Sequence, residues 1–138
     1  MSESATPVMV ILRVALFVDA VVFLSAALLN VGAKIPLGFT ELDFPVPVWQ
    51  AGIGEAVIGL ALLAAAITGR IAIAWVALGL SVVGIAFGLS STRVQGPARD
   101  IHIVLAPLAV VIFGLLLWVS QQRRRLRVKA FGPGLEES

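Results

Sequence analysis

Four long apolar runs, separated by short polar breaks, constrain this sequence more than any other feature. They extend over residues 8–31, 48–68, 71–91 and 101–120. At 1.5 Å per residue, a helix of about 20 residues crosses a hydrocarbon core of roughly 30 Å. The runs are about twice as long as the strand of a membrane barrel, and they lack its alternation of polar and apolar residues. The sequence therefore predicts an all-α fold, an integral membrane four-helix bundle.

The composition excludes other classes of protein. Hydrophobic residues make up 59% of the 138 residues and charged residues 13%, whereas about a quarter of a typical soluble chain is charged. A soluble globular domain and a disordered chain are both excluded. The chain has no cysteine and one histidine, which excludes thiol catalysis, thiolate metal sites and a bis-histidine haem. The cofactor, if there is one, is unknown at this stage.

The distribution of basic residues predicts the orientation of the helices. An even number of spans places both termini on one side of the membrane. Seven basic residues belong to that side, including five between residues 123 and 129, whereas the opposite loops hold only Lys34, Arg93 and Arg99. Because cytoplasmic segments are enriched in Lys and Arg, both termini are predicted to be cytoplasmic. This arrangement suits a multi-pass protein of a bacterial plasma (inner) membrane.

The basic run begins directly after the fourth apolar run and divides the chain in two. We expect a four-helix transmembrane domain over residues 1–122 and a basic cytoplasmic tail over residues 123–138. The lipid bilayer is the expected partner of the tail, because basic residues beside a membrane attract anionic headgroups. Nucleic acid is not an expected partner, since no aromatic residues are interleaved for base stacking.

The first loop on the side opposite the termini, residues 32–47, is the least regular part of the sequence. Pro36, Pro45 and Pro47 prevent a continuous helix there. The loop is also too apolar to be fully solvated, and we expect it to lie on or dip into the outer face of the membrane. It could serve as a lid over a cavity or as a simple interfacial connector.

Four polar side chains lie within or near the apolar runs: Asp19, Asn30, Glu55 and His102. An ionisable group at the centre of a membrane helix costs roughly 2.5 kcal/mol or more, and such groups therefore face the interior of the bundle. Glu55 belongs to a stripe of small residues that recurs at helical spacing, which is typical of closely packed membrane helices. All four side chains are expected to point inward.

Counting residues inward from the outer ends gives the depth of each group. Asn30 and His102 are expected near the rim, Glu55 about 10 Å below it and Asp19 about 18 Å below it, at 1.5 Å per residue. The prediction is a narrow polar cavity that opens to the outer side. Asn30, Glu55 and His102 would line it, with Asp19 at its floor, as ligand-binding residues.

The same groups could instead satisfy one another as buried contacts that fix the helices in register. Glu55 would then bond His102. Asp19 would bond one of three polar side chains, namely Asn30, Ser25 or Ser81.

The sequence resembles the DoxX-like group of small four-helix membrane proteins. The resemblance rests on Gly32, Ala33 and Lys34 at the end of the first run, on the proline-bearing loop, and on residues 51–63, AGIGEAVIGLALL, where Glu55 precedes a glycine and a leucine run. It implies a four-helix bundle of often unassigned function. Some relatives are membrane subunits of thiosulfate:quinone oxidoreductases or partners of oxidative-stress enzymes. Glu55 is the position to which a functional role would be carried over.

The inward-facing Glu55 and His102, the stripes of small residues and the apolar loop favour a noncatalytic membrane subunit, or a binder of a small apolar ligand such as a quinone or a lipid. The alternative is a proton-coupled exporter, because residues 34–42 partly resemble small multidrug resistance proteins. In that family the essential glutamate lies in the first helix, whereas here that helix carries Asp19 and Glu55 falls in the second.

An enzyme acting alone is the third hypothesis, with Glu55 and His102 as its acid–base pair. The sequence offers these residues no recognisable nucleophile, metal set or cofactor motif, so catalytic activity by the chain itself is not expected. A homo-oligomer or a larger membrane complex is compatible with the small residues of the third run, where Gly84 and Gly88 are spaced four apart.

Overall fold

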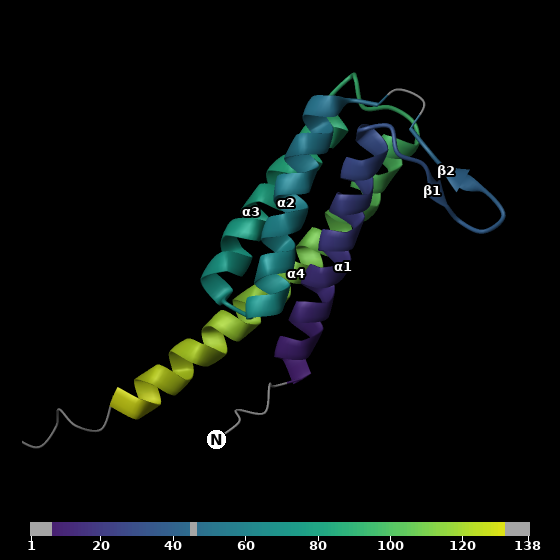
Figure 1. Ribbon diagram of the computed structural model, residues 1–138. Helices are drawn as coiled ribbons and strands as arrows, with labels where there is room; N and C mark the ends of the chain where they lie inside the picture. Colours follow the sequence, from purple (N-terminus) through teal and green to yellow (C-terminus); the bar gives the residue numbers. More distant parts are fainter. Residues whose placement is uncertain (1–6, 45–46, 132–138) are drawn as a thin grey trace, which may run out of the picture.

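The computed structural model describes residues 7–44 and 47–131. It contains four helices, α1 (Pro7–Asn30), α2 (Trp49–Thr68), α3 (Ile71–Ser90) and α4 (Pro97–Phe131), and a small hairpin between α1 and α2 formed by strands β1 (Ile35–Pro36) and β2 (Glu41–Leu42) (Figure 1). All four helices are long and apolar enough to cross a membrane. The prediction of a multi-pass four-helix membrane protein is therefore confirmed.

Small residues bring α1 and α2 into close contact along the predicted stripe. A Cβ atom on Gly52 would lie 3.1 Å from the carbonyl oxygen of Ala27, and one on Gly59 would lie 2.7 Å from Cγ of Leu24. Since protein interiors leave little free volume, a larger residue at either position would push the two helices apart. α2 and α3 are antiparallel neighbours because only Gly69 and Arg70 connect them.

The α2–α3 connection is stabilised from the neighbouring helix. Gly69 takes a left-handed conformation with φ +63° and ends α2, as glycine commonly does at helix C-termini. The guanidinium of Arg13, on α1, donates hydrogen bonds to the carbonyl oxygens of Ala66 and Ile67 at 2.7 and 2.9 Å. The last turn of α2 therefore has a charged donor for carbonyls that the helix itself leaves unpaired.

The core of the bundle is apolar, and so is much of its outer surface. The largest fully buried apolar side chains are Leu12, Leu16, Phe23, Leu29, Leu62, Leu105, Ile112 and Leu116. Valine, leucine and phenylalanine side chains on the outside of all four helices remain half-exposed or more. An apolar surface on this scale is covered by lipid in a membrane protein, so the bilayer is a direct partner of the chain.

α4 continues well beyond the apolar run that predicted it. The sequence contains neither glycine nor proline between Gly114 and Gly132, and its Gln, Arg, Leu and Lys residues favour a helix. Residues 121–129 are therefore helical and exposed, and they carry the basic run past the ends of the other helices (Figure 1). The rest of the predicted tail, residues 132–138, lies outside the described residues.

The hairpin and the described chain ends lie at opposite ends of the bundle (Figure 1). β1 and β2 are antiparallel, with Ile35 opposite Leu42 and Pro36 opposite Glu41. Gly38 has φ +85° at the first position of the two-residue turn, where hairpins of this kind favour glycine. The sequence predicted an irregular loop here, and Pro45 of that loop lies outside the described residues. The structure shows regular pairing in its first half.

Candidate functional site

Three of the four predicted polar residues meet at the end of the bundle that carries the hairpin. Asn30, Glu55 and His102 are all buried, with 3%, 5% and 3% of their surface exposed. The side-chain amide of Asn30 donates a hydrogen bond to Oε2 of Glu55 at 2.8 Å, and its oxygen accepts one from the backbone N–H of Val48 at 3.1 Å. Asn30 is the last residue of α1, so this pairing joins the end of one helix to the start of the next.

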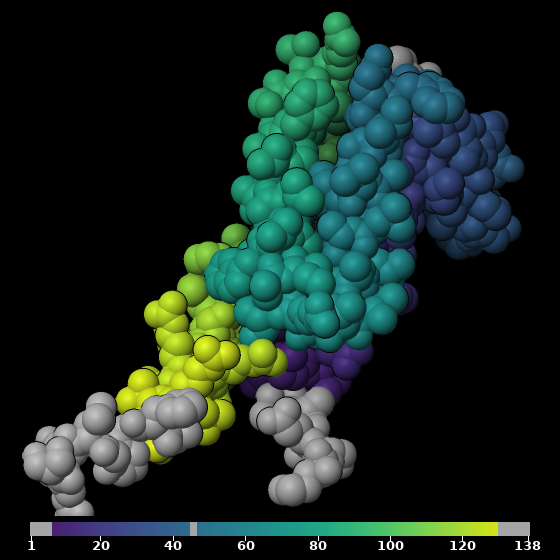
Figure 2. Space-filling model, turned by 60° about the vertical axis from the view of Figure 1, so that its left-hand side comes forward, coloured from purple at the N-terminus to yellow at the C-terminus, as the bar shows by residue number. Residues whose placement is uncertain are grey.

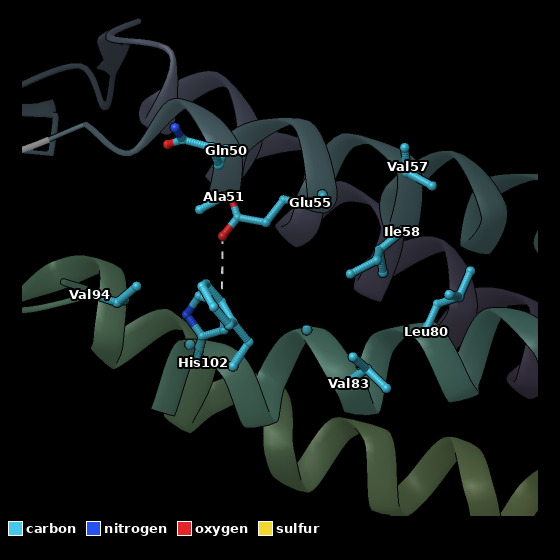
Figure 3. A pocket seen from close by; sticks show the side chains of 13 residues that line it. Gln50, Ala51, Glu55, Val57, Ile58, Leu80, Val83, Val94 and His102 are labelled. Atoms are coloured by element: carbon cyan, nitrogen blue, oxygen red, sulfur yellow. Dashed lines mark ion pairs between the residues drawn. The ribbon is translucent and has the colours of Figure 1, made fainter. Parts of the chain in front are cut away.

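His102 completes the cluster from α4. Its Nδ1 lies 2.7 Å from the carbonyl oxygen of Ala98, one turn earlier on the same helix. Because a carbonyl can only accept a hydrogen bond, Nδ1 carries a proton, and this fixes the orientation of the ring. Nε2 then faces Oε1 of Glu55 at 3.5 Å (Figure 3). This distance exceeds the 2.7–3.2 Å typical of a hydrogen bond from nitrogen to oxygen.

α3 contributes the surface against which the imidazole ring lies. A Cβ atom on Gly88 would overlap ring atoms of His102, so the ring can occupy this place only beside glycine. The cluster therefore depends on all four helices. α1 supplies Asn30, α2 supplies Glu55, α4 supplies His102 and α3 supplies the space.

A groove of about 400 Å³ lies between α2 and α3, with Glu55 and His102 at one end (Figures 2 and 3). Its walls are apolar side chains and small residues from both helices: Ala51, Gly54, Val57, Ile58, Leu80, Val83, Gly84, Phe87 and Gly88. Val94 of the α3–α4 loop and Gln50 at the start of α2 complete the lining. Gln50, Glu55 and His102 are the polar residues among the described lining residues.

The groove opens to the side of the bundle. Its wall residues Val57, Val83 and Phe87 are 55%, 67% and 55% exposed, and such apolar side chains on a membrane helix face lipid. The prediction was a narrow polar cavity, whereas the walls of this groove are mostly apolar; the predicted opening to the outer side stays a prediction. The cavity is mostly apolar and is open between two helices, because the small residues of α2 and α3 leave space that side chains do not fill.

Asp19 lies apart from this cluster. It is fully buried, and its Oδ2 accepts a hydrogen bond of 3.3 Å from the hydroxyl of Ser81 on α3. Within residues 7–44 and 47–131, its Oδ1 has no hydrogen-bond partner. Asp19 is not among the residues that line the groove. Its predicted role at the floor of a ligand cavity therefore stays a prediction.

An apolar layer separates Asp19 from Glu55. A Cβ atom on Gly84 would contact both Phe23 and Ile58. Phe23 is one turn beyond Asp19 on α1, Gly84 is one turn beyond Ser81 on α3, and Ile58 is one turn below Glu55 on α2. Side chains from α1 and α2 thus meet the backbone of α3 between the two acids. Asn30 does not line the groove either, but it holds the carboxyl group that does.

Sequence reasoning missed several residues of the site. The groove walls, among them Val57, Leu80 and Val83, carry no signal that distinguishes them from other lipid-facing residues. Gln50 is a polar residue at the beginning of an apolar run and could have been singled out. Gly88 was recognised as part of a small-residue stripe, but its contact with His102 requires knowledge of how α3 and α4 are placed.

The contacts limit what the site can do chemically. Glu55 and His102 face each other at 3.5 Å, and either group can form a hydrogen bond with a ligand. Among the described residues, no group of three His, Cys, Asp or Glu side chains is placed to hold a metal ion.

The β1–β2 hairpin does not contribute to the described lining of the groove. Residues of β1 and β2 pack instead near Phe44, which is buried against Leu29, Val94 and Ala98. The two roles considered for the loop, lid and connector, both stay predictions.

Comparison with known proteins gives no match to a family model, to a curated protein or to a solved structure. The resemblance to the DoxX-like group therefore rests only on the residues given above. The conclusion that the structure supports is that the chain is a four-span membrane protein.

Proposed function

We propose that this protein binds a membrane-soluble molecule with an apolar body and one uncharged polar end, such as a quinone, in the groove between α2 and α3. The observation that carries the proposal is the composition of the groove, whose long apolar walls end at the buried pair Glu55 and His102. A volume of about 400 Å³ falls within the range of roughly 300–1,000 Å³ found for small-molecule sites.

The polar end of the groove favours an uncharged head group. None of its described lining residues is Lys or Arg, so a phosphate or carboxylate would be buried beside Glu55 without a cation to neutralise it. A carbonyl or hydroxyl oxygen could instead bond the carboxyl group or the imidazole. The separation of 3.5 Å between Nε2 and Oε1 is a weak mutual contact that such an oxygen could replace.

The side opening of the groove supports entry from the bilayer. Exposed apolar wall residues such as Val83 and Phe87 would let a lipid-dissolved molecule enter between α2 and α3 without passing through water. The role that fits is a noncatalytic one, in which the chain presents the ligand to a partner protein or acts as the membrane subunit of a larger complex. Membership in the DoxX-like group is part of this proposal.

Three probes with the same decyl chain and different head groups test the proposal. The purified protein in lipid nanodiscs is titrated with decylubiquinone, decyl phosphate or decyltrimethylammonium, and the bound probe is measured by native mass spectrometry. We expect decylubiquinone to bind most tightly. Glu55→Gln and His102→Ala should each weaken it about fivefold, since one hydrogen bond contributes roughly 1 kcal/mol.

Glu41→Gln is the matched control, because it makes the same change at an exposed position in the hairpin. It should leave affinity unchanged. Equal binding by the protein and its Glu55→Gln variant would overturn the proposal, as would tightest binding of decyl phosphate. Tightest binding of the decyltrimethylammonium cation would favour the alternative of a proton-coupled exporter.

We also propose that the termini face the cytoplasm of a bacterial cell. The exposed helical extension with its basic residues 123–129 lies at the same end of the bundle as the start of α1 (Figure 1), and Lys and Arg are retained on the cytoplasmic side. The chain has no cysteine, so single-cysteine variants are simple to interpret. A membrane-impermeant maleimide applied to intact cells should label Arg93→Cys in the exposed α3–α4 loop and not Gln122→Cys, and the reverse would refute this orientation.

A further inference from the structure

The β1–β2 hairpin ends in an apolar tip that touches little of the rest of the protein. Phe39 is 96% exposed and Leu37 is 50% exposed. Gly38 and Thr40 are the other two residues of the tip. None of the residues 37–40 is therefore charged. The N–H of Leu37 donates a 2.7 Å hydrogen bond to the carbonyl oxygen of Thr40, and the turn is therefore a defined structure that holds both large side chains outward.

The base of the hairpin differs from its tip in both packing and charge. Ile35 and Leu42 are partly buried against the cluster around Phe44, and this contact fixes the hairpin to the bundle. Lys34 and Glu41 form an exposed ion pair at 3.7 Å, also at the base. The base thus carries a charged pair and packed apolar side chains, whereas the tip carries exposed apolar side chains and no charge.

The position of the hairpin identifies what surrounds the tip. The hairpin extends sideways from the end of the bundle and bends back beside the last turns of α1, a placement that both views show (Figures 1 and 2). In those turns Leu28 is 53% exposed and Val31 is 39% exposed. Leu28 belongs to a membrane-spanning helix that ends at Asn30, and Val31 directly follows it, so the tip lies at the level where the bilayer begins.

We propose that residues 37–40 insert into the boundary between head groups and acyl chains of the leaflet opposite the chain termini. Phe39 and Leu37 would lie among the upper acyl carbons, and the Lys34–Glu41 pair would remain among the head groups. The hairpin is then a lateral lipid anchor that holds the α1–α2 loop on the α1 side of the bundle. This inference does not depend on a ligand in the groove.

A spin label beside the tip measures its depth. Thr40→Cys, in the full chain reconstituted in phosphatidylcholine vesicles, carries a nitroxide, and its collision rates with oxygen and with a water-soluble nickel chelate are compared. Arg93→Cys in the exposed α3–α4 loop is the control for the same end of the bundle. We expect the label at residue 40 to collide more with oxygen and less with the nickel chelate than the label at residue 93.

A second variant separates insertion from simple burial. Leu37→Asp combined with Phe39→Asp, in the Thr40→Cys background, should expose the label to the nickel chelate while groove-ligand affinity is unchanged. Equal nickel accessibility at residues 40 and 93 would overturn the proposal. Protection that disappears when the protein is diluted in lipid would also overturn it and would identify a second copy of the chain as the partner.

Discussion

Gly88→Ala tests the packing that holds His102 toward Glu55. The alanine Cβ would overlap ring atoms of His102, and overpacking of this kind typically costs about 1–3 kcal/mol. Gly79→Ala is the matched control on the same helix, since a Cβ there meets no atom within 4 Å. Both substitutions gain the same helix propensity of up to about 1 kcal/mol. The free energy of unfolding of Gly88→Ala should therefore fall about 1–3 kcal/mol below that of Gly79→Ala.

Equilibrium unfolding of the purified protein in lipid–detergent micelles measures this difference. Repeating both substitutions in a His102→Ala background completes a double-mutant cycle, because removal of the ring removes the overlap. The difference between the two glycine substitutions should then largely vanish. If Gly88→Ala is as stable as Gly79→Ala, or if its cost persists without the ring, the described contact between α3 and α4 is wrong.

Two further predictions concern hydrogen bonds away from the groove, those of the exposed Arg13 and the buried one between Ser81 and Asp19. Arg13→Gln should lower the free energy of unfolding by about 1.5–3 kcal/mol, because charged hydrogen bonds to the last turn of α2 are lost; the exposed Arg93→Gln should change it little, and equal effects in thermal unfolding would contradict the capping role. Ser81→Ala should cost about 1–3 kcal/mol by removing the hydrogen bond that the Ser81 hydroxyl donates to the Asp19 carboxylate. Combining it with Asp19→Leu should cost less than the sum of the single changes, and additive losses would count against a direct contact.

The number of helices and their buried faces could be predicted because both depend on local patterns. Hydropathy over about 20 residues identifies a membrane span, and all four spans are present. The helical period placed Asp19, Asn30, Glu55 and His102 toward the interior, and their burial confirms this. Charged groups that face lipid are costly, so this inference needs no knowledge of how the helices are arranged.

The shape of the cavity could not be predicted from the same patterns. Counting residues gives depth along a helix, but it does not say which neighbour a side chain faces. Asp19 faces Ser81, and the layer around Phe23 and Ile58 separates it from the groove. The side opening likewise depends on the gap that small residues leave between α2 and α3, a tertiary property that one helix does not reveal.

The ends of the helices and strands could likewise be predicted only in part. Hydropathy ended the fourth span near residue 120, whereas α4 continues to Phe131 because helix formation does not require apolar residues. The prolines of the loop correctly excluded a helix, but β1 and β2 are two residues long. Strands this short give no periodic signal in a sequence, and the positive φ of Gly38 becomes informative only when the pairing is known.

The single histidine of the chain allows a direct test of the central claim, which is that the Glu55 carboxyl group faces His102 inside the bundle. Nitrogen-15 labelling of histidine gives signals from His102 alone, recorded by solid-state NMR in bilayers. Nδ1 should be protonated, and Glu55→Gln should shift the Nε2 resonance while Glu41→Gln leaves it unchanged. An Nε2 resonance that does not respond to Glu55→Gln would contradict the contact on which the candidate site depends.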